Sequence, residues 1–108
     1  MSRFYQIVHS RLKENARDQM LASRPGFLAA MRGHLPGLVD ATLIELEDGT
    51  WLDIVRWESP EAAIRGAQAH TAVPEAADMG NLIAEVIEVF QGPDMDHHGP
   101  GAARLSHD

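Results

Sequence analysis

One short stretch, in which an extended run passes directly into a helix, constrains the fold more than any other part of the chain. Residues 51–57 are β-branched and aromatic and alternate with polar residues, a pattern typical of a strand. Ser59 can accept a hydrogen bond from the first turn of a helix, and Pro60 has a φ angle preset for the position after the cap. The sequence therefore predicts a strand over 51–57 and a helix that begins at Pro60.

Composition limits the classes of protein to which the chain can belong. Its 108 residues, of which 44% are hydrophobic and 23% charged, predict one globular domain. The net charge of −7 disfavours partners such as nucleic acids and anionic membranes. The chain has no Cys, which excludes disulfides, thiolate metal sites and a Cys nucleophile. Because no apolar run could span a bilayer and no signal peptide is recognisable, we expect a cytoplasmic protein.

Hydrophobic periodicity and turn residues predict the first half of the chain. The first strand covers residues 3–12, and the helix that follows is expected to be capped by Asn15. Within that helix, Pro25-Gly26 predicts a kink or two short helices. A second strand over 38–47 meets the third through Asp48-Gly49, which is a strong hairpin signal. The second and third strands should therefore pair antiparallel.

The second half of the chain is predicted in the same way. The second helix should run from Pro60 to about Thr71, and its buried side is expected to carry Ala63, Ile64, Ala67 and either His70 or Thr71. A short further helix begins at Pro74, and the last strand covers 82–91. Residues 92–108 lack a periodic apolar face, which predicts a mostly disordered C-terminal tail after a domain over 1–91.

The resulting order, β-α-β-β-α-β, is that of an α+β, ferredoxin-like domain with helices on one face of a four-stranded antiparallel sheet. The third strand has large apolar residues on both sides, with Leu52 and Ile54 on one and Trp51, Val55 and Trp57 on the other. A sheet face exposed to solvent would be polar. We therefore expect a second subunit to cover the helix-free face, giving a homodimer.

Three segments together resemble a known family, the antibiotic biosynthesis monooxygenase (ABM) domain of the dimeric α+β barrel superfamily. They are Leu35-Pro36-Gly37 before the second strand, Trp57-Glu58-Ser59-Pro60-Glu61-Ala62-Ala63 at the hinge, and Val73-Pro74-Glu75 before the short helix. The resemblance covers about residues 3–91. It implies a homodimer whose sheets face each other as a barrel, with a pocket between sheet and helices in each subunit. Family members include cofactor-free oxygenases, haem-degrading enzymes and proteins without assigned activity, so the fold does not fix the function.

The functional positions that the resemblance implies do not match in this chain. Many enzymatic members have a carboxylate two residues before the hinge aromatic and a His on the second helix, which fall here on Val55 and Gly66. Haem-degrading members have an aromatic residue that again falls on Gly66 and an axial His near Asp78, so haem is disfavoured. His70 lies one helical turn beyond Gly66 and could present an imidazole from the same side.

Two histidines are candidate catalytic bases, because imidazole titrates near neutral pH. His70 lies on the second helix, whereas His9 shares a strand face with Tyr5, and either could line the pocket. Each also has a structural interpretation, as an exposed helix residue or a residue at the sheet rim. Trp51 and Trp57 could stack on a planar ligand or only fill the core. The residues expected to contact a substrate are Tyr5, Trp57, Phe27 and Met31.

The charged residues carry weaker expectations. Asp53 and Arg56 point to opposite faces of their strand and cannot pair with each other. Asp53 shares its side with two Trp residues and needs a partner such as an Arg from the other subunit, so we interpret it as an interface residue. The tail resembles a metal site only in composition, and we expect no metal to be held by Asp94, Asp96, His97, His98 and His107. No Gly-rich phosphate loop is recognisable, so no cofactor is expected.

Two functions remain open. The first is a cofactor-independent monooxygenase-like protein that acts on a small aromatic substrate of the phenol, quinol or polyketide type. The alternative is a non-catalytic dimeric α+β barrel that binds a small hydrophobic ligand. The missing carboxylate and His favour the alternative, whereas the resemblance favours the oxygenase.

Overall fold

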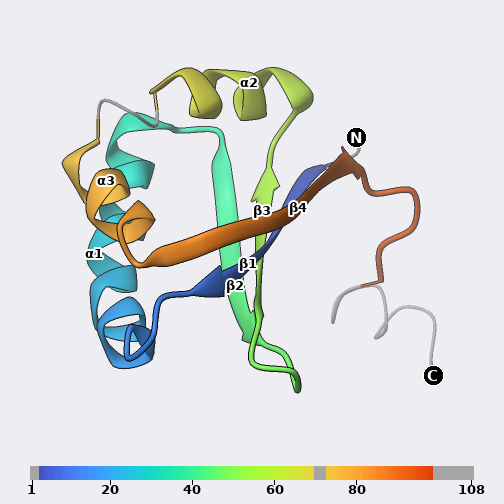
Figure 1. Cartoon of the computed structure of the whole chain (residues 1–108). Coiled ribbons are helices and arrows are strands. Elements are labelled where there is room, and N and C mark those ends of the chain that lie inside the picture. The colour runs from blue at the N-terminus through green and yellow to red at the C-terminus, as the bar shows by residue number, and fades with distance from the viewer. Residues whose placement is uncertain (1–2, 70–72, 99–108) are drawn as a thin grey trace.

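The computed structural model describes residues 3–69 and 73–98, which form an α+β domain (Figure 1). Its elements, in chain order, are β1 (Phe4–Leu12), α1 (Arg17–His34), β2 (Leu38–Glu45), β3 (Trp51–Trp57), α2 (Pro60–Ala69), α3 (Pro74–Gly80) and β4 (Ile83–Pro93). This order confirms the predicted ferredoxin-like arrangement, with α3 as the short helix expected at Pro74. No helix in the described part of the chain is long and apolar enough to cross a membrane.

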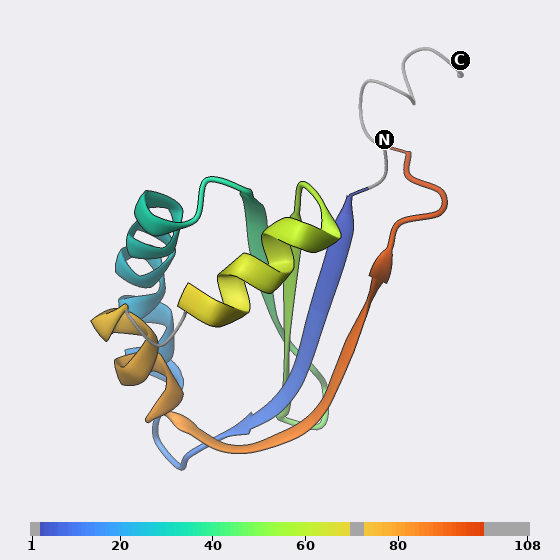
Figure 2. The same ribbon diagram turned by 90° about the horizontal axis from the view of Figure 1, so that it is seen from above.

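The four strands form one antiparallel sheet in the order β2-β3-β1-β4. All three helices lie on one side of this sheet, which curves strongly around them (Figure 2). The pairing of β1 with β4 shifts register twice, between His9 and Ser10 and between Arg11 and Leu12. Such irregularities bend the strands and increase their twist. No helix of the described residues lies over the opposite face of the sheet, and we call it the open face.

The hinge between β3 and α2 is built as the sequence predicts. The backbone N–H of Ala62 donates to Ser59 Oγ at 3.1 Å, which supplies the cap of the helix that starts at Pro60. The hairpin before β3 is also confirmed, because the N–H of Leu46 donates to the carbonyl of Thr50 at 2.8 Å. Gly49 in its turn has a φ of +86°, a conformation that favours glycine. These two local signals fix the position of β3.

The first helix differs from the expectations in two respects. α1 is one continuous helix with Pro25 inside it, so the alternative of two short helices is wrong, while the alternative of a kink remains a prediction. Proline removes a single backbone hydrogen bond from the helix. Burial of Met20, Arg24 and Met31 along α1 stabilises the remainder of the helix. Asn15 is not the cap, because its φ of 65° is left-handed and Ala16 occupies the N-cap position without a side-chain hydrogen bond.

The buried side of α2 agrees with the prediction at Ala63 but not at Ile64 and Ala67, while His70 and Thr71 lie outside the described residues. Ala62, Ala63 and Gly66 are buried, whereas Ile64 is 59% exposed and Ala67 is also exposed. The helix therefore turns its smallest residues toward the sheet. The reason is the large indole of Trp57, which lies in the core between α1, α2 and the sheet and leaves no room for bulky side chains.

The last strand is longer than predicted. β4 ends at Pro93 instead of Gln91, and the next residue, Asp94, is paired with Arg3. The N–H of Asp94 donates to the carbonyl of Arg3 at 2.9 Å, and the N–H of Arg3 donates to Asp94 Oδ1 at 3.0 Å. The first residues assigned to the tail are therefore an extension of the sheet.

Candidate functional site

A pocket of about 210 Å³ lies between α1, α3 and the helix-covered face of the sheet, and we call it the α1–α3 pocket. The strands contribute alternate residues, among them Val8 and Ser10 from β1 and Trp51 and Asp53 from β3. The helices contribute mainly apolar side chains. The remaining lining residues are Leu12, Met20, Arg24, Phe27, Leu43, Ala76, Met79, Gly80 and Ile83.

An ion pair forms the polar end of this pocket. Arg24 Nη2 donates to Asp53 Oδ1 at 2.6 Å, and Nη1 donates to Oδ2 at 3.1 Å. This bidentate geometry is the strongest form of an arginine–carboxylate contact. Arg24 is buried, at 8% exposure, and Asp53 is partly buried. The sequence correctly placed Asp53 on the side of Trp51, but its interpretation as a residue paired across an interface is wrong, because the partner is Arg24 of the same chain.

The lining of the pocket has hydrogen-bonding capacity that the described residues do not use. Arg24 binds Asp53 through its two terminal nitrogens, and its Nε–H has no acceptor within residues 3–69 and 73–98. Ser10 is 6% exposed, and its hydroxyl likewise has no partner in those ranges. Neither atom is fully enclosed by protein. Among the described residues, the only unpaired side-chain donor that is fully enclosed is Trp57 Nε1. The pocket therefore presents polar hydrogens to a ligand.

The predicted site residues do not all meet here. Phe27 lines the pocket, while Met31 and Trp57 belong to the adjoining core cluster. Tyr5 and His9 lie on the open face, because they pair with Arg56 and Leu52 while their neighbour Val8 faces the pocket. His70 lies outside the described residues. The roles assigned to these residues remain predictions.

The region where the resemblance placed a carboxylate and a His is closed. Trp57 is 3% exposed, and a Cβ added at Gly66 would lie 2.8 Å from Cζ2 and 2.9 Å from Cζ3 of its indole, with Cη2 closer still. Val55 is packed against the same cluster. The indole thus occupies the space that a side chain at position 66 would need.

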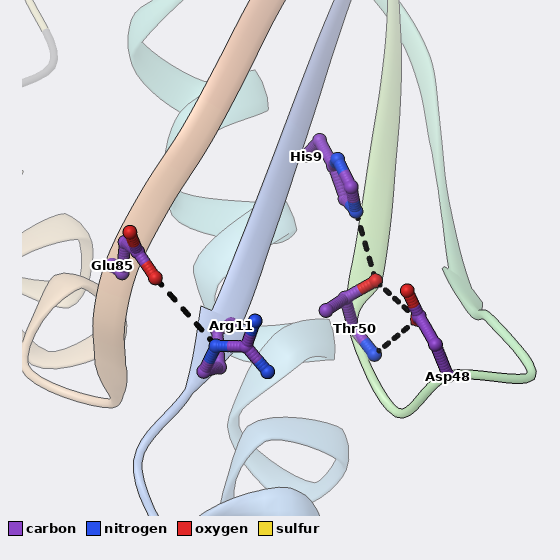
Figure 3. Close-up of polar contacts among 5 residues, drawn as sticks. All are labelled: His9, Arg11, Asp48, Thr50 and Glu85. Carbon is purple, nitrogen blue, oxygen red and sulfur yellow. Dashed lines mark hydrogen bonds and ion pairs between the residues drawn. The ribbon is translucent and has the colours of Figure 1, made fainter.

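His9 belongs to a chain of hydrogen bonds on the open face (Figure 3). Thr50 donates from its backbone N–H and its hydroxyl to Asp48 Oδ1, at 2.9 and 2.6 Å. These hydrogen bonds from Thr50 hold the pKa of Asp48 below its usual range. The hydroxyl hydrogen of Thr50 is donated to Asp48. The 2.8 Å contact between His9 Nε2 and Thr50 Oγ1 therefore requires His9 to be the donor. The Nδ1 atom of His9 is then the nitrogen that could accept a proton.

Tyr5 lies at another part of the open face. It lines a hollow of about 460 Å³ with Arg56, Asp40, Thr42, Ile54, His97 and His98. Arg56 forms two hydrogen bonds with Asp40 across β3 and β2, and these hold the pKa of Asp40 below its usual range. Arg56 and Asp53 therefore point to opposite faces, as expected.

The described residues contain no group of three or more side chains placed to hold a metal ion. His98 Nε2 lies 2.7 Å from Asp96 Oδ1, and both side chains are exposed. His107, the other histidine of the tail cluster, lies outside the described residues.

Sequence reasoning missed Arg24 and Ser10. A signal for Arg24 exists, since it lies four residues after Met20 and three before Phe27, on the buried stripe of α1 where a charge needs a partner. Ser10 follows the same alternation in β1 that brings Val8 into the pocket. Nothing local shows that Arg24 contacts Asp53 or that Ser10 lines the same pocket.

No protein-family model and no curated protein matches the chain. Several solved structures are similar to the chain. A candidate antibiotic biosynthesis monooxygenase from Chloroflexus aurantiacus is 21% identical, with 91% of this chain and 98% of that one covered and a TM-score of 0.64. Another candidate from Bordetella bronchiseptica is 13% identical, with coverages of 85% and 96% and a TM-score of 0.72. SnoaB from Streptomyces nogalater, a cofactor-independent oxygenase, is 16% identical, with coverages of 93% and 98% and a TM-score of 0.65. At these identities the similarity concerns the fold, and by its fold the chain is an ABM-like α+β domain.

Proposed function

We propose that the chain binds a small phenol or quinol in the α1–α3 pocket, as the substrate of a cofactor-independent monooxygenase reaction. The observation that carries this proposal is the Arg24–Asp53 pair in a mainly apolar pocket. An apolar cavity of about 150 Å³ can bind benzene, so a volume of about 210 Å³ suits a substituted ring or a fused bicycle. The apolar walls would hold the ring and exclude water.

The pair offers a route for the proton. Asp53 would accept the phenolic proton, and the adjacent guanidinium of Arg24 would stabilise the phenolate that forms. The electron-rich ring then reduces O₂. For a dihydroxynaphthalene, one oxygen atom becomes a carbonyl oxygen, the ring loses two hydrogens, and the second oxygen leaves as water, which gives a hydroxynaphthoquinone. The fold shared with SnoaB, a cofactor-independent oxygenase, supports this reaction class.

Non-catalytic binding is the second candidate. The observation that favours it is again the pairing of Asp53, because both oxygens of this carboxylate already accept a hydrogen bond from the guanidinium of Arg24. In this case the same pocket would hold the aromatic ligand without turnover. The two candidates thus share a site and differ in chemistry.

Oxygen uptake distinguishes the candidates. A panel of dihydroxynaphthalenes should give oxygen consumption and a product that gains one atom of ¹⁸O from ¹⁸O₂, and both should be lost in Asp53→Asn. Asp40→Asn is the matched control, since Asp40 is also paired with an Arg but lies on the open face. His9→Ala tests the base predicted from the sequence. Thermal stabilisation by the panel without oxygen uptake would establish binding alone.

We also propose that a second copy covers the open face. The row Thr42, Ile54, Ile7 and Phe90 crosses all four strands there, and Phe90 is 46% exposed. Sedimentation should show a dimer that Ile54→Lys dissociates. Ile64→Lys, at an exposed position on α2, should leave the dimer intact. A wild-type monomer at micromolar concentration would contradict the proposal.

A further inference from the structure

We infer that the α1–α3 pocket selects its ligand by charge, accepting an un-ionised hydroxyl and excluding a carboxylate, and that Asp53 is the residue that sets this specificity. The inference rests on the proposed function, because it concerns the ligand of the same pocket. It narrows the expected class of ligand from small aromatic molecules to neutral phenols, and it excludes aromatic acids of the same size.

The first step is the balance of charge. Arg24 and Asp53 are the charged side chains among the described residues that line the pocket, and they cancel each other. The guanidinium is buried and held by both carboxylate oxygens. A ligand carboxylate would therefore enter as an additional buried anion without a free counter-charge, which is costly. A neutral hydroxyl carries no such cost.

The second step is hydrogen bonding. The lining of the pocket offers donors from Arg24 Nε and the Ser10 hydroxyl, and acceptor capacity on Asp53, whose oxygens each accept one hydrogen bond from Arg24. A phenolic hydroxyl can donate to the carboxylate and accept from Ser10 or Arg24 at the same time. A ligand carboxylate only accepts, and its oxygens would face those of Asp53.

The third step concerns the reaction. If the phenolic proton moves to Asp53, the pocket then holds a neutral acid, a guanidinium and a phenolate, and the total charge is still zero. Anion formation inside the pocket therefore does not disturb the balance, whereas entry of a preformed anion does. Asp53 would thus distinguish a phenol that ionises after binding from an acid that is ionised before it.

Three probes with one ring system test the inference by titration calorimetry at pH 7. They are 2-naphthol, which is neutral because phenols ionise near pH 10, 2-naphthoate, which is an anion, and 2-naphthylmethylamine, which is a cation. Wild-type protein should bind 2-naphthol at least about tenfold tighter than 2-naphthoate. Equal or tighter binding of 2-naphthoate would overturn the inference while leaving small-aromatic binding in place. Failure of all three probes to bind would refute the proposed function itself and this inference with it.

Variants that remove the charge of Asp53 or of Arg24 test the inference further. Asp53→Asn leaves Arg24 unpaired and should shift the preference to 2-naphthoate, whereas Arg24→Gln leaves Asp53 unpaired and should shift it to the amine. Asp40→Asn, which changes the same charge on the open face, should keep the wild-type order. An unchanged order in folded Asp53→Asn would overturn the assignment to Asp53. Where circular dichroism shows that a variant is unfolded, the ranking of the wild-type protein decides.

Discussion

Gly66 is the position at which the packing of this chain can be tested most directly. In Gly66→Ala, the new Cβ would lie within 2.9 Å of three atoms of the Trp57 indole, a separation shorter than packed side chains tolerate. Trp57 is 3% exposed and cannot swing into solvent. Either the ring or α2 must therefore move.

The magnitude follows from two opposing effects. Overpacking a core costs about 1–3 kcal/mol. Alanine is the better helix former and recovers about 0.5–1 kcal/mol inside a helix. Gly66→Ala should therefore lower the free energy of unfolding by about 1 kcal/mol net, or the melting temperature by roughly 4–8 °C for a domain near this size.

Gly26→Ala in α1 is the matched control, because a Cβ there has no atom within 4 Å. That variant gains the helix propensity without the clash, so it should be about 0.5–1 kcal/mol more stable than the wild type. Urea denaturation gives the free energy of unfolding of both variants. The difference between the two values isolates the overpacking cost, because both variants gain the same helix propensity. In a Trp57→Phe background, where the outer ring atoms are missing, the cost of Gly66→Ala should shrink. Equal stability of the Gly66→Ala and Gly26→Ala variants would refute the reasoning.

Two further predictions concern hydrogen bonds outside the pocket. Ser59→Ala removes the cap that Ala62 N–H uses and should lower the free energy of unfolding by about 1 kcal/mol in urea denaturation, and no loss would show that the cap is replaced by water. Thr50→Val removes the hydroxyl bound to Asp48, so NMR titration should show the pKa of Asp48 rising toward its ordinary value. Because the folded pKa is lowered, the stabilisation by ionised Asp48 is present above the ordinary carboxyl pKa and is lost as pH falls through the lowered value. The difference in stability between wild type and Thr50→Val should therefore disappear in acid.

The fold could be predicted because its signals are local. Ser59-Pro60 marks the start of α2, Asp48-Gly49 marks the hairpin, and alternation over 51–57 marks β3, each within a few residues. Where two features of the sequence favoured different structures, the structure was harder to predict. Pro25 argues for a helix break by its own chemistry, but burial along α1 outweighs the loss of one hydrogen bond.

The site could be predicted only in part, because it depends on contacts between distant residues. Alternation assigns Asp53 to the side of Trp51 and requires a partner, but it does not say which of the Arg residues supplies it. Arg24 precedes Asp53 by 29 positions, and the two meet only because α1 lies across the inner face of β3. The sheet face on which His9 lies could not be predicted for a related reason, since the direction of β1 side chains relative to the helices follows from the register with β3.

The closed region around Trp57 and the pocket beside Asp53 lie on the same helix-covered face of the sheet. The positions that the resemblance associates with catalysis, Val55 and Gly66, adjoin an indole that fills the available space. The neighbouring α1–α3 pocket has its own charged groups, and it has donors without a partner among the residues that the structure describes. Any activity of the helix-covered face should therefore depend on Arg24 and Asp53. Oxygenase or binding activity that survives loss of both charges, but is abolished by a small change at Gly66, would place the site under α2 instead.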